Sequence, residues 1–165
     1  MNKPLQGVRV LDLTHMLAGP YGAMMLADLG AETIKVEPLA GEGTRKLLAN
    51  DPKNSLDGMG AYYLALNRNK QSIAIDLKSP DGQRVFHDLV RESDVVISNF
   101  GVGVPERLGI DYDTLQAINP RIITCTTVFL SKQTIRLMFP TMVQTLYMTS
   151  TLMGYLAFRT VMRRM

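Results

Sequence analysis

The chain switches repeatedly between strand-like and helix-like hydrophobic patterns, and this alternation restricts its fold more than any other feature. Residues 8–13 form a short aliphatic run typical of a buried strand. Residues 18–30 change period: Pro20 suits the first turn of a helix, apolar residues recur between positions 24 and 29, and Gly30 can end it. Residues 33–37 again resemble a strand. A strand, a helix and a strand in about 30 residues predict a βαβ unit with parallel strands and a right-handed crossover.

The same alternation continues to residue 127. Residues 38–60 are polar and rich in Gly, Asn and Asp, which predicts a long loop with a short helix. Residues 72–77 alternate as a strand does, and Ser79 and Pro80 fit the N-cap and first position of a helix. Strands at 94–98 and 121–127 flank a glycine-rich turn and a short helix headed by Asp111. We therefore predict an α/β domain at residues 1–128, with a Rossmann-like, mostly parallel sheet and helices on both faces.

Residues 129–165 do not continue this pattern. All 15 acidic residues lie at or before Asp113, so the formal net charge of +3 is due to five basic residues in this tail, and residues 1–128 carry a net −2. A nucleic-acid partner is disfavoured, because it needs a basic stripe on the fold itself. Met and Thr supply 12 of the 37 tail residues, and only one glycine remains. We expect an aberrant tail produced by a frameshift or a truncation.

Location and metal content are also restricted by the sequence. Residues 137–158 form a 22-residue window without a charge, long enough for a membrane span, but Pro140, Gln144 and several hydroxyl residues dilute its hydropathy. The first residues lack the apolar stretch and cleavage site of a secretory signal. Cys125 is the single cysteine, which excludes an internal disulfide and a cysteine-cluster metal site. We expect a cytoplasmic protein that is not held in a membrane and binds no metal.

Three short segments next to predicted strands are candidate ligand sites. Residues 15–20 lead from the first strand into a helix, where free N–H groups attract phosphate, although Gly19 and Pro20 would also suit a plain turn. Residues 99–103 form a glycine turn followed by Arg107; on spacing alone, a tight turn with a solvated arginine is favoured over a phosphate site. Residues 67–70 are a basic cluster of the kind that is usually solvated, though it could supply phosphate contacts.

The sequence gives little support for dinucleotide binding or for nucleophilic catalysis by Ser, His or Cys. Gly19 and Gly22 lack the G-x-G-x-x-G dinucleotide fingerprint, while Glu37 stands about where a ribose-binding acid would lie, so a nicotinamide-binding domain stays a weak alternative. The chain has no nucleophile elbow, HExxH or P-loop motif. His87, the second of two histidines, lies on a predicted helix away from any motif, so a histidine triad is unsupported. Cys125 lies in an apolar strand and is more typical of a small buried residue than of a nucleophile.

Several segments, in order, resemble the family III CoA-transferases, the group that includes formyl-CoA transferase, carnitine CoA-transferase and alpha-methylacyl-CoA racemase. The matching segments are PLQGVRVLDLTHMLAGPYGAMMLADLGAETIKVEP, GEGTR, LNRNKQSIAIDLKSPDG, SDVVISNFGVGVPERLGIDYDTL and NPRIITC. They run almost unbroken from residue 4 to 125, about three-quarters of the chain. The resemblance implies an enzyme that moves coenzyme A between an acyl-CoA and a small carboxylic acid, by covalent steps at a catalytic aspartate.

The resemblance also implies which residues contact CoA. The contacts follow the first strand, precede the helix that begins near Pro80, and follow the strand at 94–98, with one phosphate-binding arginine. The matching residues are His15, Leu17, Ala18, Ile75, Asp76, Leu77, Lys78, Asn99, Phe100, Gly101 and Arg107. Some family members have an arginine where this chain has Pro38, so that contact is lost or is supplied by Arg45.

The chain departs from the family after residue 125. Members continue with a glycine-rich stretch and reach the catalytic aspartate some tens of residues later, whereas no acidic residue here follows Asp113. The family's second domain and the C-terminal return that interlocks its homodimers are also missing, so we expect a fold incomplete relative to the family. The sequence predicts a truncated, catalytically inactive CoA-binding portion with no catalytic residue. A non-catalytic CoA- or nucleotide-binding module, and a fragment tethered to a membrane through 137–158, stay open as alternatives.

Overall fold

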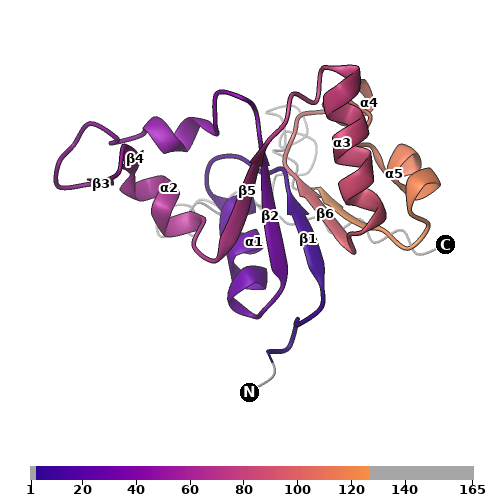
Figure 1. Ribbon diagram of the computed structural model, residues 1–165, viewed down its shortest axis with the longest axis horizontal. Coiled ribbons are helices and arrows are strands. Elements are labelled where there is room, and N and C mark those ends of the chain that lie inside the picture. The colour runs from indigo at the N-terminus through magenta and orange to yellow at the C-terminus, as the bar shows by residue number, and fades with distance from the viewer. Residues whose placement is uncertain (1–2, 127–165) are drawn as a thin grey trace, which may run out of the picture.

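A five-stranded parallel sheet organises residues 3–126, which are the residues that this computed structural model describes (Figure 1). The strands are β1 (Arg9–Asp12), β2 (Glu32–Glu37), β5 (Lys70–Ala74), β6 (Val95–Ser98) and β7 (Ile123–Thr126). They lie in the order β5-β2-β1-β6-β7, and every neighbouring pair is parallel. The α/β class and parallel sheet expected from the sequence are confirmed. The predicted tail, 129–165, lies outside the described residues.

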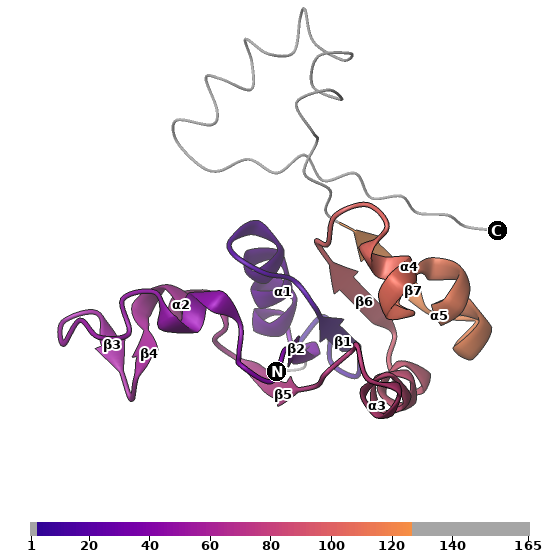
Figure 2. The same cartoon turned by 90° about the horizontal axis from the view of Figure 1, so that it is seen from above.

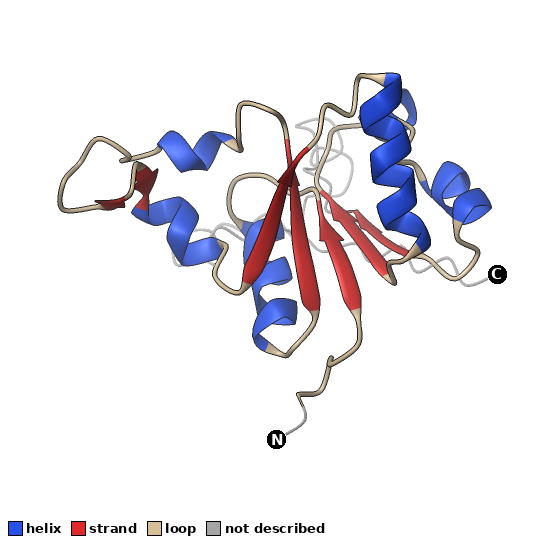
Figure 3. Cartoon of the chain, viewed as in Figure 1, coloured by secondary structure: helices blue, strands red, loops and turns tan. Residues whose placement is uncertain are grey.

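Helices cover both faces of this sheet (Figures 2 and 3). Helix α1 (Ala18–Asp28) packs on one face, where Val10 and Ile97 meet Ala23. Helices α3 (Pro80–Arg91) and α5 (Tyr112–Ile118) cover the opposite face, where Leu11 lies in a larger core with Phe86 and other buried residues. The period-2 alternation of a strand explains why Val10 and Leu11 face opposite layers. The prediction of helices on both faces is confirmed.

The predicted starts of α3 and α5 are also present. The Ser79 hydroxyl accepts a hydrogen bond from the Gly82 backbone N–H at 3.0 Å, and Pro80 stands at the first helical position. The Asp111 carboxylate accepts the Thr114 backbone N–H at 3.0 Å. These side chains satisfy N–H groups that a helix start leaves without partners.

Some local predictions were wrong. The third strand was expected at 72–77 but spans Lys70–Ala74; the alternation persists past it because Ile75 and Leu77 still pack on the α3 side of the core. The expected long loop at 38–60 contains the predicted short helix, η1 (Gly43–Lys46), and also a small hairpin of β3 (Ser55–Leu56) and β4 (Met59–Gly60). Helices α2 (Ala61–Leu66) and α4 (Val104–Leu108) were not anticipated, because each is too short to show a helical period.

Within residues 3–126, no helix has the length and apolar character needed to cross a membrane. The uncharged window 137–158 lies outside that range. The described part of the chain also contains no group of His, Cys, Asp or Glu side chains arranged to hold a metal ion.

Candidate functional site

The candidate contact segments follow the carboxyl ends of three strands in one parallel sheet, so they share one edge. His15, Leu17 and Ala18 follow β1, residues 75–78 follow β5, and residues 99–101 follow β6. Two strands, β2 and β1, separate β5 from β6 in the sheet. At about 4.8 Å per strand spacing, the outer segments lie about 14 Å apart. Open parallel sheets bind ligands at this edge, and the arrangement suits an extended ligand.

Two of these segments are joined directly. The Asn99 side-chain oxygen accepts the His15 backbone N–H at 2.9 Å, and the Asn99 amide donates to the His15 carbonyl at 2.8 Å. The His15 and Phe100 rings also pack edge-to-face, with centroids 5.4 Å apart. The structure therefore brings His15, Asn99 and Phe100 together. Both ends of the Asn99 amide are occupied, so this residue holds the turn after β1.

The turn after β1 leads directly into the N-terminus of α1. Met16 adopts a left-handed backbone conformation with φ 70°, and Leu17 is the N-cap without a side-chain hydrogen bond. Gly19 allows the helix to approach the strand end, since a Cβ there would lie 2.4 Å from the Cβ of Thr14. The first N–H groups of a helix have no partner inside it, so the backbone N–H groups of Ala18 and Gly19 can donate to an anion.

The segment after β5, residues 75–78, has side chains both in the core and at the surface. The Ile75 side chain is buried in the α3-side core, and its N–H donates to the Glu37 carbonyl at 2.8 Å. Asp76 and Lys78 are exposed, and the Asp76 carboxylate accepts the Lys78 N–H at 3.0 Å. A ligand at this segment would therefore meet Asp76 and Lys78 and the backbone, while the side chain of Ile75 stays in the core.

Arg107 lies exposed on α4, the short helix that follows the glycine turn. Among residues 3–126 it forms no ion pair, so its charge is available to solvent or to an anion. Gly103, with φ 76°, caps the start of α4 in a conformation that favours glycine.

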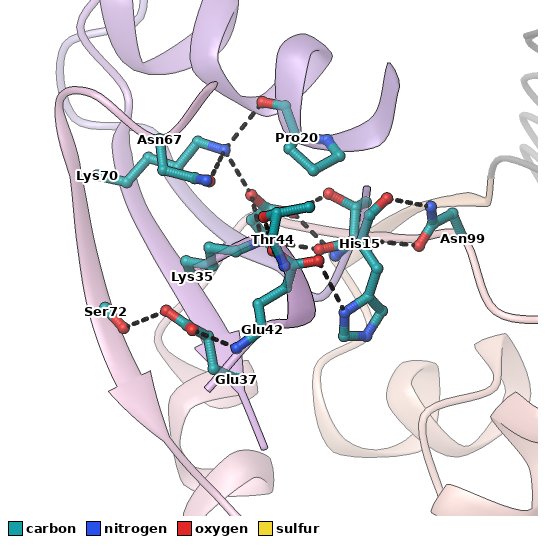
Figure 4. A network of polar contacts seen from close by, with 12 residues as sticks. His15, Pro20, Lys35, Glu37, Glu42, Thr44, Asn67, Lys70, Ser72 and Asn99 are labelled. Carbon is teal, nitrogen blue, oxygen red and sulfur yellow. Dashed lines mark hydrogen bonds and ion pairs between the residues drawn. The ribbon is translucent and has the colours of Figure 1, made fainter. Parts of the chain in front are cut away.

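The basic cluster at 67–70 is divided: Arg68 and Asn69 are exposed, as expected of a solvated cluster, whereas the Lys70 side chain is buried and is not free for a phosphate contact. The Lys70 side chain is 1% exposed, and its ammonium donates to Asp12 at 2.8 Å, to the Pro20 carbonyl at 2.9 Å and to Asn67 at 2.8 Å (Figure 4). Arg68 and its neighbour Asn69 both bind the Asp28 carboxylate, at 2.5 Å and 2.7 Å. The cluster ties β5 to β1 and α1.

Glu37 and Arg45 are joined in a buried network, which counts against Glu37 as a ribose-binding acid. Glu37 is 2% exposed, and its carboxylate accepts two hydrogen bonds from Arg45, at 2.6 and 2.7 Å. Tyr63 donates to it at 2.8 Å and Ser72 at 2.6 Å. The guanidinium also stacks 4.0 Å from the centre of the Tyr63 ring. Both oxygens of Glu37 are therefore engaged, which leaves none for a ribose. The Arg45 guanidinium is bound to Glu37 and Tyr63, and its expected role in place of the family arginine at position 38 stays a prediction.

Sequence reasoning missed the role of Glu42, which is 3% exposed beside this network. Its carboxylate accepts the backbone N–H of Met16 at 3.2 Å. It also accepts the Thr44 N–H at 3.0 Å and lies 3.9 Å from the His15 Nδ1 atom (Figure 4). Burial, together with the positive charge of Lys35, lowers the pKa of His15. The GEGTR segment that contains Glu42 gave no indication of the contact with Met16, because Met16 lies 26 residues earlier in the chain.

Buried carboxylates and cations are balanced at this sheet edge. Asp12, Glu37 and Glu42 are each 3% exposed or less, and their neighbours include Lys35, Lys70 and Arg45. A buried charge is tolerated when it is paired and hydrogen-bonded. This network fixes the strand ends from which the candidate contact segments emerge.

The Glu37 interactions predict a specific dependence of stability on pH. Burial raises the pKa of Glu37, but hydrogen bonds from Arg45, Ser72 and Tyr63 outweigh it and hold that pKa at about 2, against an ordinary 4.5. The unfolded chain binds a proton on Glu37 as pH falls below 4.5, and the folded chain does not. About 3 kcal/mol of stability is therefore lost between pH 4.5 and pH 2. Urea unfolding across this range should show that loss for the native chain and a smaller one for Glu37→Gln; equal pH dependences would contradict the pairing.

Comparison with known proteins identifies the family to which this chain belongs. The family model for CoA-transferase family III matches residues 5–133. The chain belongs to CoA-transferase family III. Among family III relatives, the formyl-CoA:oxalate CoA-transferase of Rhodopseudomonas palustris (strain HaA2) is 47% identical over 124 residues, covering 74% of this chain and 28% of that protein. The succinate–glutarate CoA-transferase of Agrobacterium fabrum is 47% identical over 128 residues, covering 74% of this chain and 31% of that protein.

Two solved structures have a similar fold. The crystal structure of a CAIB/BAIF family protein from Brucella suis superposes with a TM-score of 0.70 at 42% identity, covering 76% of this chain and 33% of that one. Rv3272 from Mycobacterium tuberculosis gives a TM-score of 0.70 at 36% identity, covering 78% of this chain and 34% of that one. This family III chain thus spans about a third of the length of the relatives that it matches.

Proposed function

We propose that this chain binds coenzyme A, or the CoA part of an acyl-CoA, along the carboxyl edge of its sheet. The observation that carries the proposal is the pair of hydrogen bonds between Asn99 and the His15 backbone, at 2.9 and 2.8 Å. These hydrogen bonds join the segments after β1 and β6, both of which match CoA contacts of the family. In this binding mode, the N–H groups at the α1 N-terminus and the Arg107 guanidinium donate hydrogen bonds to phosphate oxygens of CoA. The apolar Leu17 and Phe100 contact the less polar parts of CoA.

We further propose that the chain by itself does not transfer CoA. The family reaction requires a carboxylate that attacks the thioester carbonyl, and no Asp or Glu follows Asp113 in this sequence. Of the carboxylates at the described sheet edge, Asp12, Glu37 and Glu42 are buried and hold neighbouring groups by hydrogen bonds. Asp76 is exposed there and accepts the Lys78 backbone N–H. The reaction that we propose for family members with that carboxylate is CoA transfer between an acyl-CoA and a carboxylic acid.

The geometry of the site does not support the alternative of a nicotinamide-binding domain. Its single support was Glu37 as a ribose-binding acid, and that carboxylate is fully engaged by Arg45, Tyr63 and Ser72. A membrane tether through 137–158 falls outside the described residues.

Thermal unfolding of the purified full chain tests the proposal. At a CoA concentration a hundred times its Kd, the free energy of unfolding rises by about 2.7 kcal/mol, which corresponds to about 5 °C or more in Tm for a chain of this size. NAD at the same concentration serves as the control and should leave Tm unchanged. An equal rise in Tm with CoA and with NAD would contradict a CoA site. So would the absence of any rise in Tm at millimolar CoA. Steady turnover with an acyl-CoA and an acceptor acid, free of contaminating transferase, would overturn the proposed inactivity.

A further inference from the structure

Glu42 and the turn after β1 are coupled through a strained backbone position. Met16 has φ 70°, a conformation that non-glycine residues seldom adopt without compensating contacts. Its side chain is 57% exposed, so packing of that side chain gives little support for the conformation. The Met16 backbone N–H donates to Glu42 Oε1 at 3.2 Å, and Glu42 is 3% exposed. A buried carboxylate therefore stabilises the exposed, strained residue.

Other contacts give the Glu42 carboxylate a fixed orientation. Its second oxygen, Oε2, accepts the Thr44 backbone N–H at 3.0 Å and also the Thr44 hydroxyl. The Glu42 backbone N–H is itself fixed by Glu37 at 2.8 Å. Both carboxylate oxygens are therefore used, one toward its own loop and one toward the turn after β1. An amide in this place has only one acceptor oxygen, and its NH₂ group would face an N–H donor.

The turn is thus held from two sides. Asn99, after β6, binds the backbone of His15, and Glu42, after β2, binds the backbone of Met16. The next residues, Leu17 and Ala18, begin α1 and belong to the proposed CoA contacts. We propose that Glu42 is a positioning residue: it holds Met16 in the left-handed conformation and so places the α1 N-terminus for the CoA phosphates. This inference depends on the proposed CoA binding for its ligand, but the placement of the turn can be measured without one.

Glu42→Gln in the full chain tests the proposal, with Thr44→Val as the matched control. Thr44→Val removes the hydroxyl contact to Glu42 and leaves the Met16 hydrogen bond intact. At a temperature where both variants are folded, Glu42→Gln should weaken CoA binding by about tenfold, and Thr44→Val should leave the Kd within about twofold of the native value. Equal Kd values for native chain and Glu42→Gln, or equal losses in both variants, would overturn the positioning role.

A backbone readout separates this role from the proposed function. In ¹⁵N-labelled chain without ligand, Glu42→Gln should shift the amide resonances of Met16, Leu17 and Ala18, and Thr44→Val should not. If the native chain binds no CoA, the proposed function fails, and these resonances still decide whether Glu42 places the turn. Unchanged resonances in Glu42→Gln would overturn the inference whether or not CoA binds.

Relief of backbone strain supplies an independent check. Glycine adopts positive φ without penalty, so Met16→Gly should recover most of the CoA affinity that Glu42→Gln loses. No recovery in the double variant would contradict the proposal. Should Glu42→Gln lack a cooperative unfolding transition, Glu42→Asp replaces it, because a side chain one methylene shorter cannot reach both Thr44 and Met16.

Discussion

Replacing Asp12 with alanine should lower the free energy of unfolding by about 3–5 kcal/mol, enough to abolish cooperative folding of a marginal domain. Asp12 is fully buried, accepts a hydrogen bond from the Lys70 ammonium at 2.8 Å, and lies 3.8 Å from that of Lys35. It also accepts the Thr14 backbone N–H at 2.9 Å. Alanine leaves both buried lysines without their counter-ion, and an unpaired buried charge costs more than the pair contributes.

Urea unfolding followed by circular dichroism measures this loss. Asp81→Ala is the control, because Asp81 is 84% exposed and its one ion pair within the described part of the chain is with Arg84 on α3. Surface substitutions of this kind change stability by about 0.5 kcal/mol or less. A similar small loss in Asp12→Ala would show that the buried charges at the sheet edge do not hold the strands together.

Gly82→Ala should damage both stability and ligand binding, although alanine favours helices. An added Cβ would lie 2.0 Å from the Asp76 carbonyl oxygen, which is backbone and cannot rotate away. The preference of alanine over glycine in a helix is worth about 1 kcal/mol, and overpacking of this kind costs about 1–3 kcal/mol or more. The net result is a less stable chain whose segment at 76–78 is displaced, so CoA affinity falls as well.

Gly43→Ala provides the matched control for Gly82→Ala. Gly43 has no positive φ, and apart from its two chain neighbours no residue in the range 3–126 has an atom within 4 Å of an added Cβ, so its substitution should leave Tm and CoA affinity unchanged. Differential scanning calorimetry gives Tm, and titration calorimetry gives the CoA affinity. A Gly82→Ala chain as stable as the native one would show that the contact between α3 and Asp76 is not as close as described.

The fold was predictable wherever hydrophobic period and capping residues agreed. A short aliphatic run at 8–13 predicted β1, and the strand-like segment at 33–37 predicted β2. Ser79, Pro80 and Asp111 marked two helix starts that the structure confirms. The helices at 61–66 and 104–108 were not predictable, because one or two turns do not establish a period.

The network beneath the site could not be predicted, since its partners come from distant segments. Lys70 follows Arg68 and two asparagines and resembles part of a solvated cluster, yet its partner Asp12 is 58 residues away. Arg45 was considered only as a substitute for a family arginine, and nothing in the sequence indicated that Glu37 and Tyr63 surround it. The contact residues themselves were identified through the family resemblance and remain a prediction. Which of their side chains are accessible came from the structure, as the buried Ile75 shows.

Titration of the ¹⁵N-labelled full chain with coenzyme A tests the central claim most directly. The account predicts saturable shifts at the three candidate segments, in the amides of Leu17, Ala18, Lys78, Phe100 and Gly101, and at the Arg107 side chain, with no matching response to NAD. Absence of shifts at millimolar CoA, or shifts confined to residues away from the carboxyl edge such as the β3–β4 hairpin, would contradict it.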